Sequence, residues 1–539
     1  MYKNILFVFI FIYISCKQDE IIYEENLYNP FVTSNGTQLV DGNGNPITIK
    51  GVAFSNFVWE NAISQTHHNE LDFQRVKDMN MNTIRFYLNY KFFEDDSNPY
   101  IYKESGFDWL NQNIQWAKNK NIKLILNMHV PQGGYQSQGT GDALWTNPEN
   151  QNRLIALWKE IAKRYKDNIT ILGYGFVNEP VPTQNVAQWG ILAQKIINAV
   201  RPIDKNHIFF IERAIYTKQT FENDTNMNFP IVNDTNMAYE FHFYDPYQFT
   251  HQLFSWAFNF DGGKYPDENY IYYSNSQWHT AIFNNPSPSS QNFEWTYFEG
   301  VKYLVNDSQI KLGYPVCVGQ NAGGAIYFDD IEIKEYDAND IYIRTINQNI
   351  PNNSSGFYFW SINTSGNGII SNQGRTDANA IKIYGTTDDA NMSGIDFVFL
   401  PKQGYKYQIS GWMKGENINA NANIRLRIDF YKSNAPIYTR NKSYLEAEFT
   451  KYYAVSNSRN KPLYLGEFGT GKPTFENNKG GNQWVNDMVE ICKQYNSYFT
   501  YHAYHEDSFG IYFGYDELPN QSNANTSLIN LFKNKLQNY

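Results

Sequence analysis

The chain has 539 residues, with 44 lysines and arginines against 54 aspartates and glutamates, so its formal net charge is −10. Hydrophobic residues make up 42% of the chain and aromatic residues 17%, which is enough to bury sizeable cores and excludes a globally disordered protein. An acidic chain without a long basic run is a poor match for nucleic acid, because phosphates are bound by clusters of lysine and arginine. The length predicts two to four domains, or one large barrel with an addition.

The amino terminus has the pattern of an export signal. Lys3 precedes an unbroken apolar run over residues 5–14, which is too short to span a bilayer but suits the core of a signal peptide. The small residue before Cys16 resembles a bacterial lipobox, in which cleavage leaves a lipidated cysteine; an ordinary signal peptide with an incidental cysteine is the alternative. We expect a signal peptide over residues 1–16 and a polar linker over residues 17–30. The acidic start of this linker resembles a surface-export signal of Gram-negative lipoproteins, which implies an outer-membrane or cell-surface protein held only by its lipid anchor.

Two cysteines remain in the predicted mature chain, Cys317 and Cys492. They fall in different predicted domains, so we expect two buried free thiols rather than a disulfide. No clustered His/Cys spacing indicates a transition-metal site.

From residue 47 onward, short apolar runs alternate with helical patterns. A typical helical stripe is Leu154, Leu157, Trp158, Ile161 and Tyr165. Strands that alternate with helices form parallel βαβ units, and eight of them favour a closed barrel over an open sheet. The sequence therefore predicts an α/β protein with a (β/α)8 TIM barrel. Its strands are expected at 47–54, 83–88, 122–128, 169–177, 208–212, 237–243, 463–468 and 498–504.

The pattern changes between residues 286 and 460. Helical spacing fades there, and β-type alternation separated by Asn, Gly and Ser takes over, as in residues 424–428. We predict an antiparallel, jelly-roll-like β-sandwich inserted before the seventh barrel strand. The first part of the barrel is then expected over residues 31–285 and the second over residues 461–539.

Two glutamates fall at the ends of predicted barrel strands. Glu179 follows the fourth strand and Glu467 ends the seventh. The functional residues of a parallel barrel lie at the carboxyl ends of its strands. Glycoside hydrolysis needs a pair of carboxyl groups, one to protonate the leaving oxygen and one to attack the anomeric carbon or activate water.

Five motifs in order along the chain resemble the cellulase family of glycoside hydrolases, family five. Asn178-Glu179-Pro180 resembles the acid/base motif and Glu467 the nucleophile position. The resemblance implies retention through a covalent glycosyl–enzyme intermediate, with no cofactor for catalysis and no catalytic metal. It also implies that substrate and nucleophile are positioned by Arg85, His129, Asn178, His242 and Tyr244.

The eighth strand departs from the family pattern, because it lacks the usual tryptophan of the sugar subsite next to the cleavage point. His502 or Tyr504 is expected in its place. Further rings predicted to stack on sugars follow other strands, and His251 and Gln252 are additional subsite candidates. The predicted stacking rings are Trp59, Tyr135, Trp145 and Trp256.

The insert resembles a carbohydrate-binding module in residues 325–333 and 404–412. Its tryptophans either present rings to a glycan or fill the core of the sandwich: Trp295, Trp360 and Trp412. An equally open alternative is a structural role, in which the insert forms a wall of the substrate cleft of the barrel. Asp329 and Asp330 are candidates for a structural calcium ion, which prefers oxygen ligands.

The sequence thus predicts a monomeric retaining β-glycoside hydrolase of the endo-β-1,4-glucanase type, with a polysaccharide or oligosaccharide as substrate. Two alternatives stay open. One is a β-mannanase, xyloglucanase or exo-β-glucosidase of the same family. The other is a surface lipoprotein that captures glycan without catalysis.

Overall fold

The computed structural model describes residues 29–220, 223–282, 290–351 and 356–539. The predicted signal peptide, Cys16 and most of the predicted linker lie outside these residues. Within the described ranges, no helix is both long and apolar enough to cross a bilayer.

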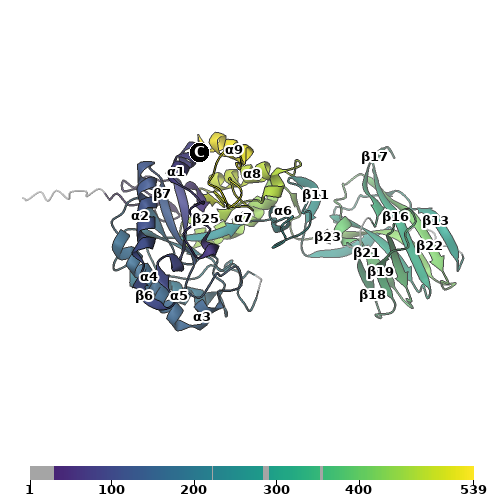
Figure 1. Ribbon diagram of the computed structural model, residues 1–539. Coiled ribbons are helices and arrows are strands. Elements are labelled where there is room, and N and C mark those ends of the chain that lie inside the picture. The colour runs from purple at the N-terminus through teal and green to yellow at the C-terminus, as the bar shows by residue number, and fades with distance from the viewer. Residues whose placement is uncertain (1–28, 221–222, 283–289, 352–355) are drawn as a thin grey trace, which may run out of the picture. The chain divides into compact units, whose positions relative to one another are not determined.

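Eight parallel strands close into a barrel, as the sequence predicted (Figure 1). Their order around the barrel is β10-β25-β26-β3-β4-β7-β8-β9. Every residue of β4 is buried, as expected for a parallel strand covered on both faces. The strands are β3 (Lys50–Phe54), β4 (Thr83–Asn89), β7 (Lys123–Val130), β8 (Ile171–Gly175), β9 (Ile208–Glu212), β10 (Met237–Phe243), β25 (Leu463–Phe468) and β26 (Tyr498–Tyr501).

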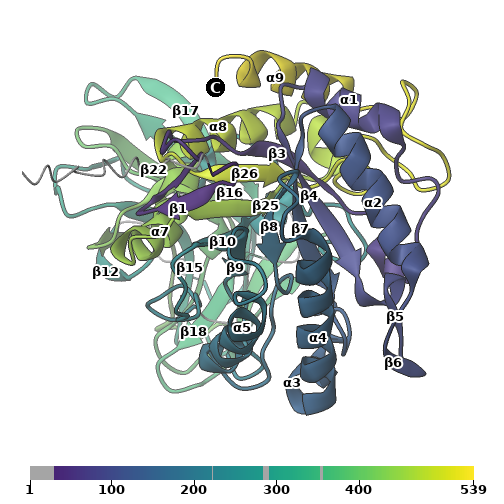
Figure 2. The ribbon, with the colours of Figure 1, turned by 90° about the vertical axis from the view of Figure 1, so that its left-hand side faces the viewer.

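Helices surround these strands (Figure 2). The predicted stripe on α4 is buried along its length. A capping box between Asn69 and Asp72 fixes the start of α1. The helices are α1 (Glu70–Asp78), α2 (Glu104–Asn119), α3 (Asp142–Thr146), α4 (Pro148–Tyr165), α5 (Val186–Val200), α6 (Tyr247–Thr250), α7 (Lys442–Ser458), α8 (Gly481–Gln494) and α9 (Thr526–Leu536). Two small hairpins, β1 (Thr33–Asn35) with β2 (Gln38–Val40) and β5 (Glu94–Asp95) with β6 (Asn98–Tyr102), complete this part.

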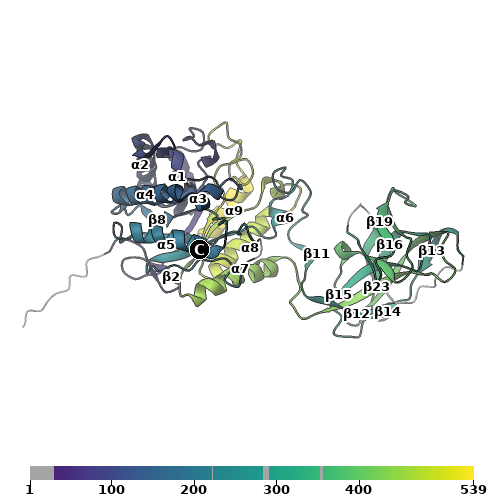
Figure 3. The same cartoon turned by 90° about the horizontal axis from the view of Figure 1, so that it is seen from below.

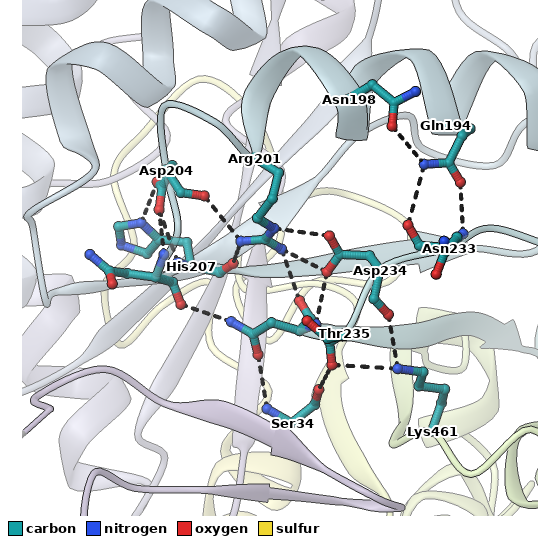
Figure 4. Close-up of polar contacts among 12 residues, drawn as sticks. Ser34, Gln194, Asn198, Arg201, Asp204, His207, Asn233, Asp234, Thr235 and Lys461 are labelled. Carbon is teal, nitrogen blue, oxygen red and sulfur yellow. Dashed lines mark hydrogen bonds and ion pairs between the residues drawn. The ribbon is translucent and has the colours of Figure 1, made fainter.

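A dense polar network lies at the amino end of the barrel (Figure 4). The Arg201 guanidinium donates two hydrogen bonds of 2.9 Å to the carboxylate of Asp234, and further ones to the backbone carbonyls of Asp204 and His207. Lys461 donates to the backbone carbonyl of Asp234 at 2.9 Å. The network ties the connection before β9 to those before β10 and β25.

Antiparallel strands form the inserted sandwich (Figure 3). One sheet has the order β12-β23-β15-β21-β18, and the other contains β13, β22, β16, β20 and β19 with β14 and β17 paired at its side. Isoleucines such as Ile331, Ile333 and Ile424 fill the core, and Cys317 is a buried free thiol within it. The strands are β12 (Ser276–Ala281), β13 (Phe293–Glu299), β14 (Tyr303–Leu304), β15 (Leu312–Gln320), β16 (Ala325–Tyr336), β17 (Tyr342–Ile350), β18 (Tyr358–Ser361), β19 (Asn367–Ser371), β20 (Ala380–Tyr384), β21 (Ala390–Ser393), β22 (Lys406–Glu416) and β23 (Asn423–Ser433).

The antiparallel part begins and ends earlier than the predicted range of 286–460. Strand β11 (Asp267–Tyr272) precedes the sandwich and strand β24 (Tyr438–Arg440) follows it, and the two strands pair as an antiparallel ribbon. Residues 442–458 form helix α7, in which Leu445, Phe449 and Tyr452 are buried at helical spacing. Phe449 packs on Tyr495 beside α8, so this segment is a barrel helix rather than part of the sandwich.

The side chains singled out in the insert do not fill its core. Trp360 is 42% exposed, and Trp295 and Trp412 are half-buried on outward positions. Asp329 accepts a hydrogen bond from the backbone of Arg375, and Asp330 accepts from the side chains of Arg375 and Thr376. The carboxylate oxygens that were predicted to bind calcium therefore accept hydrogen bonds from groups of the protein itself.

Candidate active site

Two clusters of polar side chains follow the barrel strands. One surrounds Arg85 of β4 and includes residues of β9 and β10 and the residues after β8; the other surrounds Glu467 of β25 and includes residues of and after β10 and after β26. In a closed parallel barrel the carboxyl ends of all strands face the same end, so both clusters belong to that end.

Arg85 is fully buried and is surrounded by acceptors. Its Nε donates to Oε1 of Glu240 at 2.8 Å, and its Nη2 donates to Oδ1 of Asn178 at 2.9 Å. Nη2 also lies 3.6 Å from Oε2 of Glu212. The guanidinium therefore offsets the negative charge of two buried carboxylates, Glu240 and Glu212, and fixes the orientation of the Asn178 amide.

Glu179 follows β8 in a left-handed backbone conformation, with φ of 45°. This conformation is uncommon for a residue with a side chain, and surrounding contacts must hold it. The backbone N–H of Glu179 donates to Oε2 of Glu212 at 2.9 Å. The carboxyl group of Glu179 is half-buried, whereas its neighbour Asn178 is completely buried.

The amide of Asn178 is only partly used. Its oxygen accepts from Arg85, but among the described residues its Nδ2 has no hydrogen-bond partner. A buried donor left unpaired costs about 1–3 kcal/mol. This N–H group is therefore available to an acceptor on a ligand.

Glu467 lies in β25 with its carboxylate held by residues that follow neighbouring strands. The Tyr244 hydroxyl donates to Oε2 of Glu467 at 2.8 Å. Nδ1 of His242 lies 3.4 Å and Nδ1 of His502 lies 3.9 Å from the same oxygen. Glu467 is only 4% exposed, so these groups replace most of its water contacts.

His502, one of the two candidates for the place of the family's tryptophan, directly follows β26. Nε2 of His502 lies 3.4 Å from Glu506. Burial disfavours the charged ring, but the carboxylates of Glu506 and Glu467 outweigh this effect and raise the pKa of His502. His502, beside Glu467, therefore holds a proton more readily than a free histidine does. The other candidate, Tyr504, is fully buried and packs on Tyr512, so it presents no open ring face.

Trp59 and Tyr135 share a pocket of about 270 Å³ at the ends of β3, β4 and β7. Trp59 is 37% exposed. The Tyr135 hydroxyl lies 2.8 Å from Nε2 of His129, whose ring stacks on Tyr87 at 3.9 Å. Both predicted rings therefore face an open pocket, and His129 positions one of them.

The other two predicted stacking rings, Trp256 and Trp145, differ in their exposure to solvent. Trp256 is 57% exposed and stacks on Phe254, which leaves its outer face open. Trp145 is buried, and its indole N–H donates to Gln136 at 2.7 Å, so the prediction of a stacking role was wrong because neighbouring loops cover the ring.

His251 and Gln252, the additional subsite candidates, are also buried. The amide of Gln252 donates to the backbone of Phe249 and accepts from Lys479, and it thereby holds its own loop. His251 stacks on Tyr247 at 3.7 Å. Burial, together with the charge of His502, lowers the pKa of His251 to about 3.

Three buried glutamates were missed by the sequence reasoning: Glu212, Glu240 and Glu506. Glu212 ends the apolar run of β9 and Glu240 interrupts that of β10, and a charged residue inside a buried strand was the signal that would have found them. Both face Arg85, which is the reason that they tolerate burial.

Comparison with known proteins places this site in a family. Residues 40–308 match the family model "Cellulase (glycosyl hydrolase family 5)". Endoglucanase C of Acetivibrio thermocellus is 28% identical over 188 residues, which are 35% of this chain and 53% of that protein. A beta-xylosidase of Phanerodontia chrysosporium is 27% identical over 222 residues, 34% of this chain and 46% of the relative. Cellodextrinase A of Ruminococcus flavefaciens is 24% identical over 189 residues, 35% of this chain and 54% of the relative.

The chain spans about half the length of the curated relatives that it matches. The family match begins before β3 and covers the strands that carry Arg85, His129, Glu179 and His242. On this match and on the closed barrel, the chain belongs to glycosyl hydrolase family 5, the cellulase family.

Proposed function

We propose that the chain is a retaining endo-β-1,4-glucanase-type enzyme, with Glu467 as nucleophile and Glu179 as acid/base. The observation that carries this proposal is the setting of Glu467. Its carboxylate accepts a hydrogen bond from Tyr244 and lies beside two histidines. Hydrogen bonds to the ionised form keep a carboxylate charged and aimed, which is what a nucleophile requires.

The reaction then runs in two displacements. Glu467 forms a bond to the anomeric carbon while the bond to the leaving oxygen breaks, and the proton of Glu179 goes to that oxygen. In the second step Glu179 takes a proton from water, the water oxygen attacks the anomeric carbon, and Glu467 leaves. The free N–H of Asn178 is suited to the sugar 2-hydroxyl, a contact that strengthens in the transition state.

A β-glucan is the proposed substrate. Two of the three relatives described above are named for cellulose-type substrates, and the third is named a beta-xylosidase. Exposed rings at Trp59 and Trp256 suit stacking on a chain of sugars. β-Mannan, xyloglucan and exo-action on short oligosaccharides are the alternatives, since specificity lies in the loops.

Reducing-sugar release from β-glucans, β-mannans, xylans and xyloglucan tests the proposal. Glu467→Gln and Glu179→Gln should each lower activity on the same polymer by at least about 10²-fold, the size of an acid/base contribution. Glu476→Gln, an exposed glutamate on the connection after β25, is the matched control and should keep full activity. Binding to a polymer without cleavage of any would favour the non-catalytic glycan-binding protein.

The stereochemistry needs its own measurement. Proton NMR of the first product should show the β-anomer before mutarotation, and initial appearance of the α-anomer would contradict retention. The same experiment with short and long substrates separates modes of action, because exo-action releases one product size from the start.

We also propose that the chain is exported and lipidated on Cys16, and that it acts as a monomer at the outer membrane or cell surface. Support comes only from the lipobox-like residues and the acidic stretch after them. Mass spectrometry of the mature amino terminus tests it, with Cys16→Ala expected to abolish the added lipid mass. An unlipidated terminus in the wild type would contradict the anchor.

A further inference from the structure

A tight turn after β26 holds Glu506 beside the ring of His502. Glu506 is 5% exposed, and its Oε1 accepts the backbone N–H of Phe509 at 3.2 Å across the turn. The same oxygen lies 3.4 Å from Nε2 of His502. A Cβ on Gly510 would lie 2.1 Å from the backbone oxygen of Tyr512 and 2.3 Å from that of Glu506, so the turn needs glycine there. The backbone of the turn therefore sets the position of the Glu506 carboxylate.

The ring of His502 is held by aromatic neighbours and by its own backbone. Its centroid lies 5.7 Å from the ring centroid of Phe509 and 6.3 Å from that of Tyr244. The backbone carbonyl of His502 packs against the residue after β25, since a Cβ on Gly469 would come within 2.2 Å of its oxygen. The side chain of His502 is only 15% exposed. These contacts fix the direction in which its two nitrogens point.

Each nitrogen of the His502 ring faces a different carboxylate. Nε2 lies 3.4 Å from Glu506, and Nδ1 lies 3.9 Å from Oε2 of Glu467. A neutral imidazole carries a single N–H group, whereas an imidazolium carries one on each nitrogen. Only the protonated ring can therefore present an N–H group to both carboxylates at once.

Other titratable groups around His502 come from β10 and from the segment after α6. His242 of β10 lies 3.4 Å from the same oxygen of Glu467, and a proton on His242 disfavours one on His502. His251, after α6, has a pKa of about 3 and adds no charge near neutral pH. Burial lowers the pKa of His502, and Glu506 is the stronger of the two carboxylates that raise it. The proton on His502 therefore depends mainly on Glu506.

We propose that Glu506 is a positioning residue that acts through His502, and that the pair keeps the Glu467 carboxylate ionised and oriented for attack. The proposal rests on the proposed role of Glu467 as nucleophile. A cation beside a carboxylate favours its ionised form, so loss of the pair should raise the pKa of Glu467. Removal of the negative charge of Glu506 has the opposite direct effect. The loss of the ring's charge outweighs it, because the ring lies 3.9 Å from Glu467 whereas Glu506 faces the other nitrogen.

The pH dependence of kcat/KM tests the proposal. Reducing-sugar release is measured on the polymer that the full-length enzyme cleaves fastest among β-glucan, β-mannan, xylan and xyloglucan. The acid limb of the profile reports the ionisation of the nucleophile in the free enzyme. Glu506→Gln should move this limb upward by about one pH unit, the effect of one neighbouring charge, which is about a tenfold loss of kcat/KM on the limb. Glu506→Asp should recover part of the shift. Asp507→Asn, an exposed acid next in the chain, is the control and should leave the limb in place.

A double variant separates positioning from a merely structural role. His502→Phe should move the limb in the same direction, and addition of Glu506→Gln should give no further upward shift, because Glu506 acts through the ring. A structural role would lower activity equally at every pH. An unmoved limb in Glu506→Gln, or a second upward shift in the double variant, would overturn the proposal.

NMR titration of the histidine rings in the full-length protein gives a readout without turnover. His502→Phe identifies the signal of His502, and Glu506→Gln should lower the pKa of His502 by about one unit. A lowered pKa in a protein that hydrolyses none of the four polymers would overturn the assignment of the nucleophile, and this proposal with it. Hydrolysis with neither the pKa nor the acid limb moved would overturn this proposal alone.

Discussion

The two ends of the barrel each carry a pocket, and the larger of the two lies at the amino end, opposite the proposed catalytic residues. The amino-end pocket has a volume of about 540 Å³ and is lined by Arg201, Lys205 and Asp234. The carboxyl-end pocket has about 270 Å³ and is lined by Trp59 and Tyr135. A choice by pocket volume alone would therefore select the end opposite the proposed catalytic residues.

The two ends differ in whether their buried polar groups have hydrogen-bond partners among the described residues. At the amino end, Arg201 donates to a carboxylate and to two backbone carbonyls, and it serves to fix the connections between elements. At the carboxyl end, Asn178 keeps an unused buried donor and Trp59 keeps an open ring. Satisfied polar groups indicate structure, whereas buried groups left over indicate a missing ligand.

Removing the unused donor should produce the largest effect. Asn178→Ala is expected to lower kcat/KM by about 10²–10³-fold, as for loss of one donor that acts in the transition state. The Tm should fall only modestly, because removal of the unpaired N–H partly offsets the loss of the acceptor for Arg85. Asn198→Ala, an exposed asparagine lining the amino-end pocket, is the control for kinetics. Full activity with a lowered Tm in Asn178→Ala would reverse our assignment of the two ends.

Breaking the network at the other end should affect stability alone. Arg201→Met leaves the nearly buried carboxylate of Asp234 without its main partner, and we expect the free energy of unfolding to fall by about 2–3 kcal/mol. Urea denaturation measures this loss, and Arg201→Lys should recover part of it. Activity per folded molecule should stay at the wild-type level; a fall in kcat would show that the amino end contributes to the reaction.

The pH dependence of stability should originate in part at the carboxyl end. Burial lowers the pKa of His251 to about 3 from 6.5, so the folded protein holds a neutral ring while the unfolded chain takes up a proton below pH 6.5. The stabilisation of the fold by His251 is therefore complete above pH 6.5, and the free energy of unfolding declines as the pH falls from 6.5 toward 3. The slope is about 1.4 kcal/mol per pH unit.

Urea denaturation of the wild type and His251→Gln from pH 7 to pH 4 measures this difference. The variant should lose the slope that belongs to His251, so the two stability curves should converge as the pH falls. Parallel curves would contradict the assignment.

The smallest effect is expected in the carboxyl-end pocket. Trp59→Ala should raise KM for long substrates by about tenfold, the value of one stacking contact, with kcat nearly unchanged. Trp145→Phe keeps the packing of a buried ring and loses only its hydrogen bond to Gln136, so KM should not change. Equal KM changes in both variants would mean that exposure does not distinguish these two rings.

The sequence could predict the barrel because its strands are continuous apolar runs that need burial on both faces. It could also predict the places of Glu179 after β8 and of Glu467 near the end of β25, because both stand in motifs at strand ends; their roles in the reaction stay predictions. It could not predict which rings stay open. Trp145 is covered by Gln136 and Trp189 from other segments, which only the folded chain brings together. Helix α7 was missed because turn-rich strands precede it and mask its helical spacing.

The position of the insert has a consequence for how the barrel is completed. Strands β10 and β25 are neighbours in the barrel, yet 219 residues lie between Phe243 and Leu463. During synthesis the first six strands emerge as an open sheet whose edges, β3 and β10, have no partners until residues 463–501 follow. The contiguous sandwich can fold before then. A chain that stops between Phe243 and Leu463 therefore lacks Glu467 and keeps two unpaired strand edges, so the barrel closes only after residues 463–501 have been made.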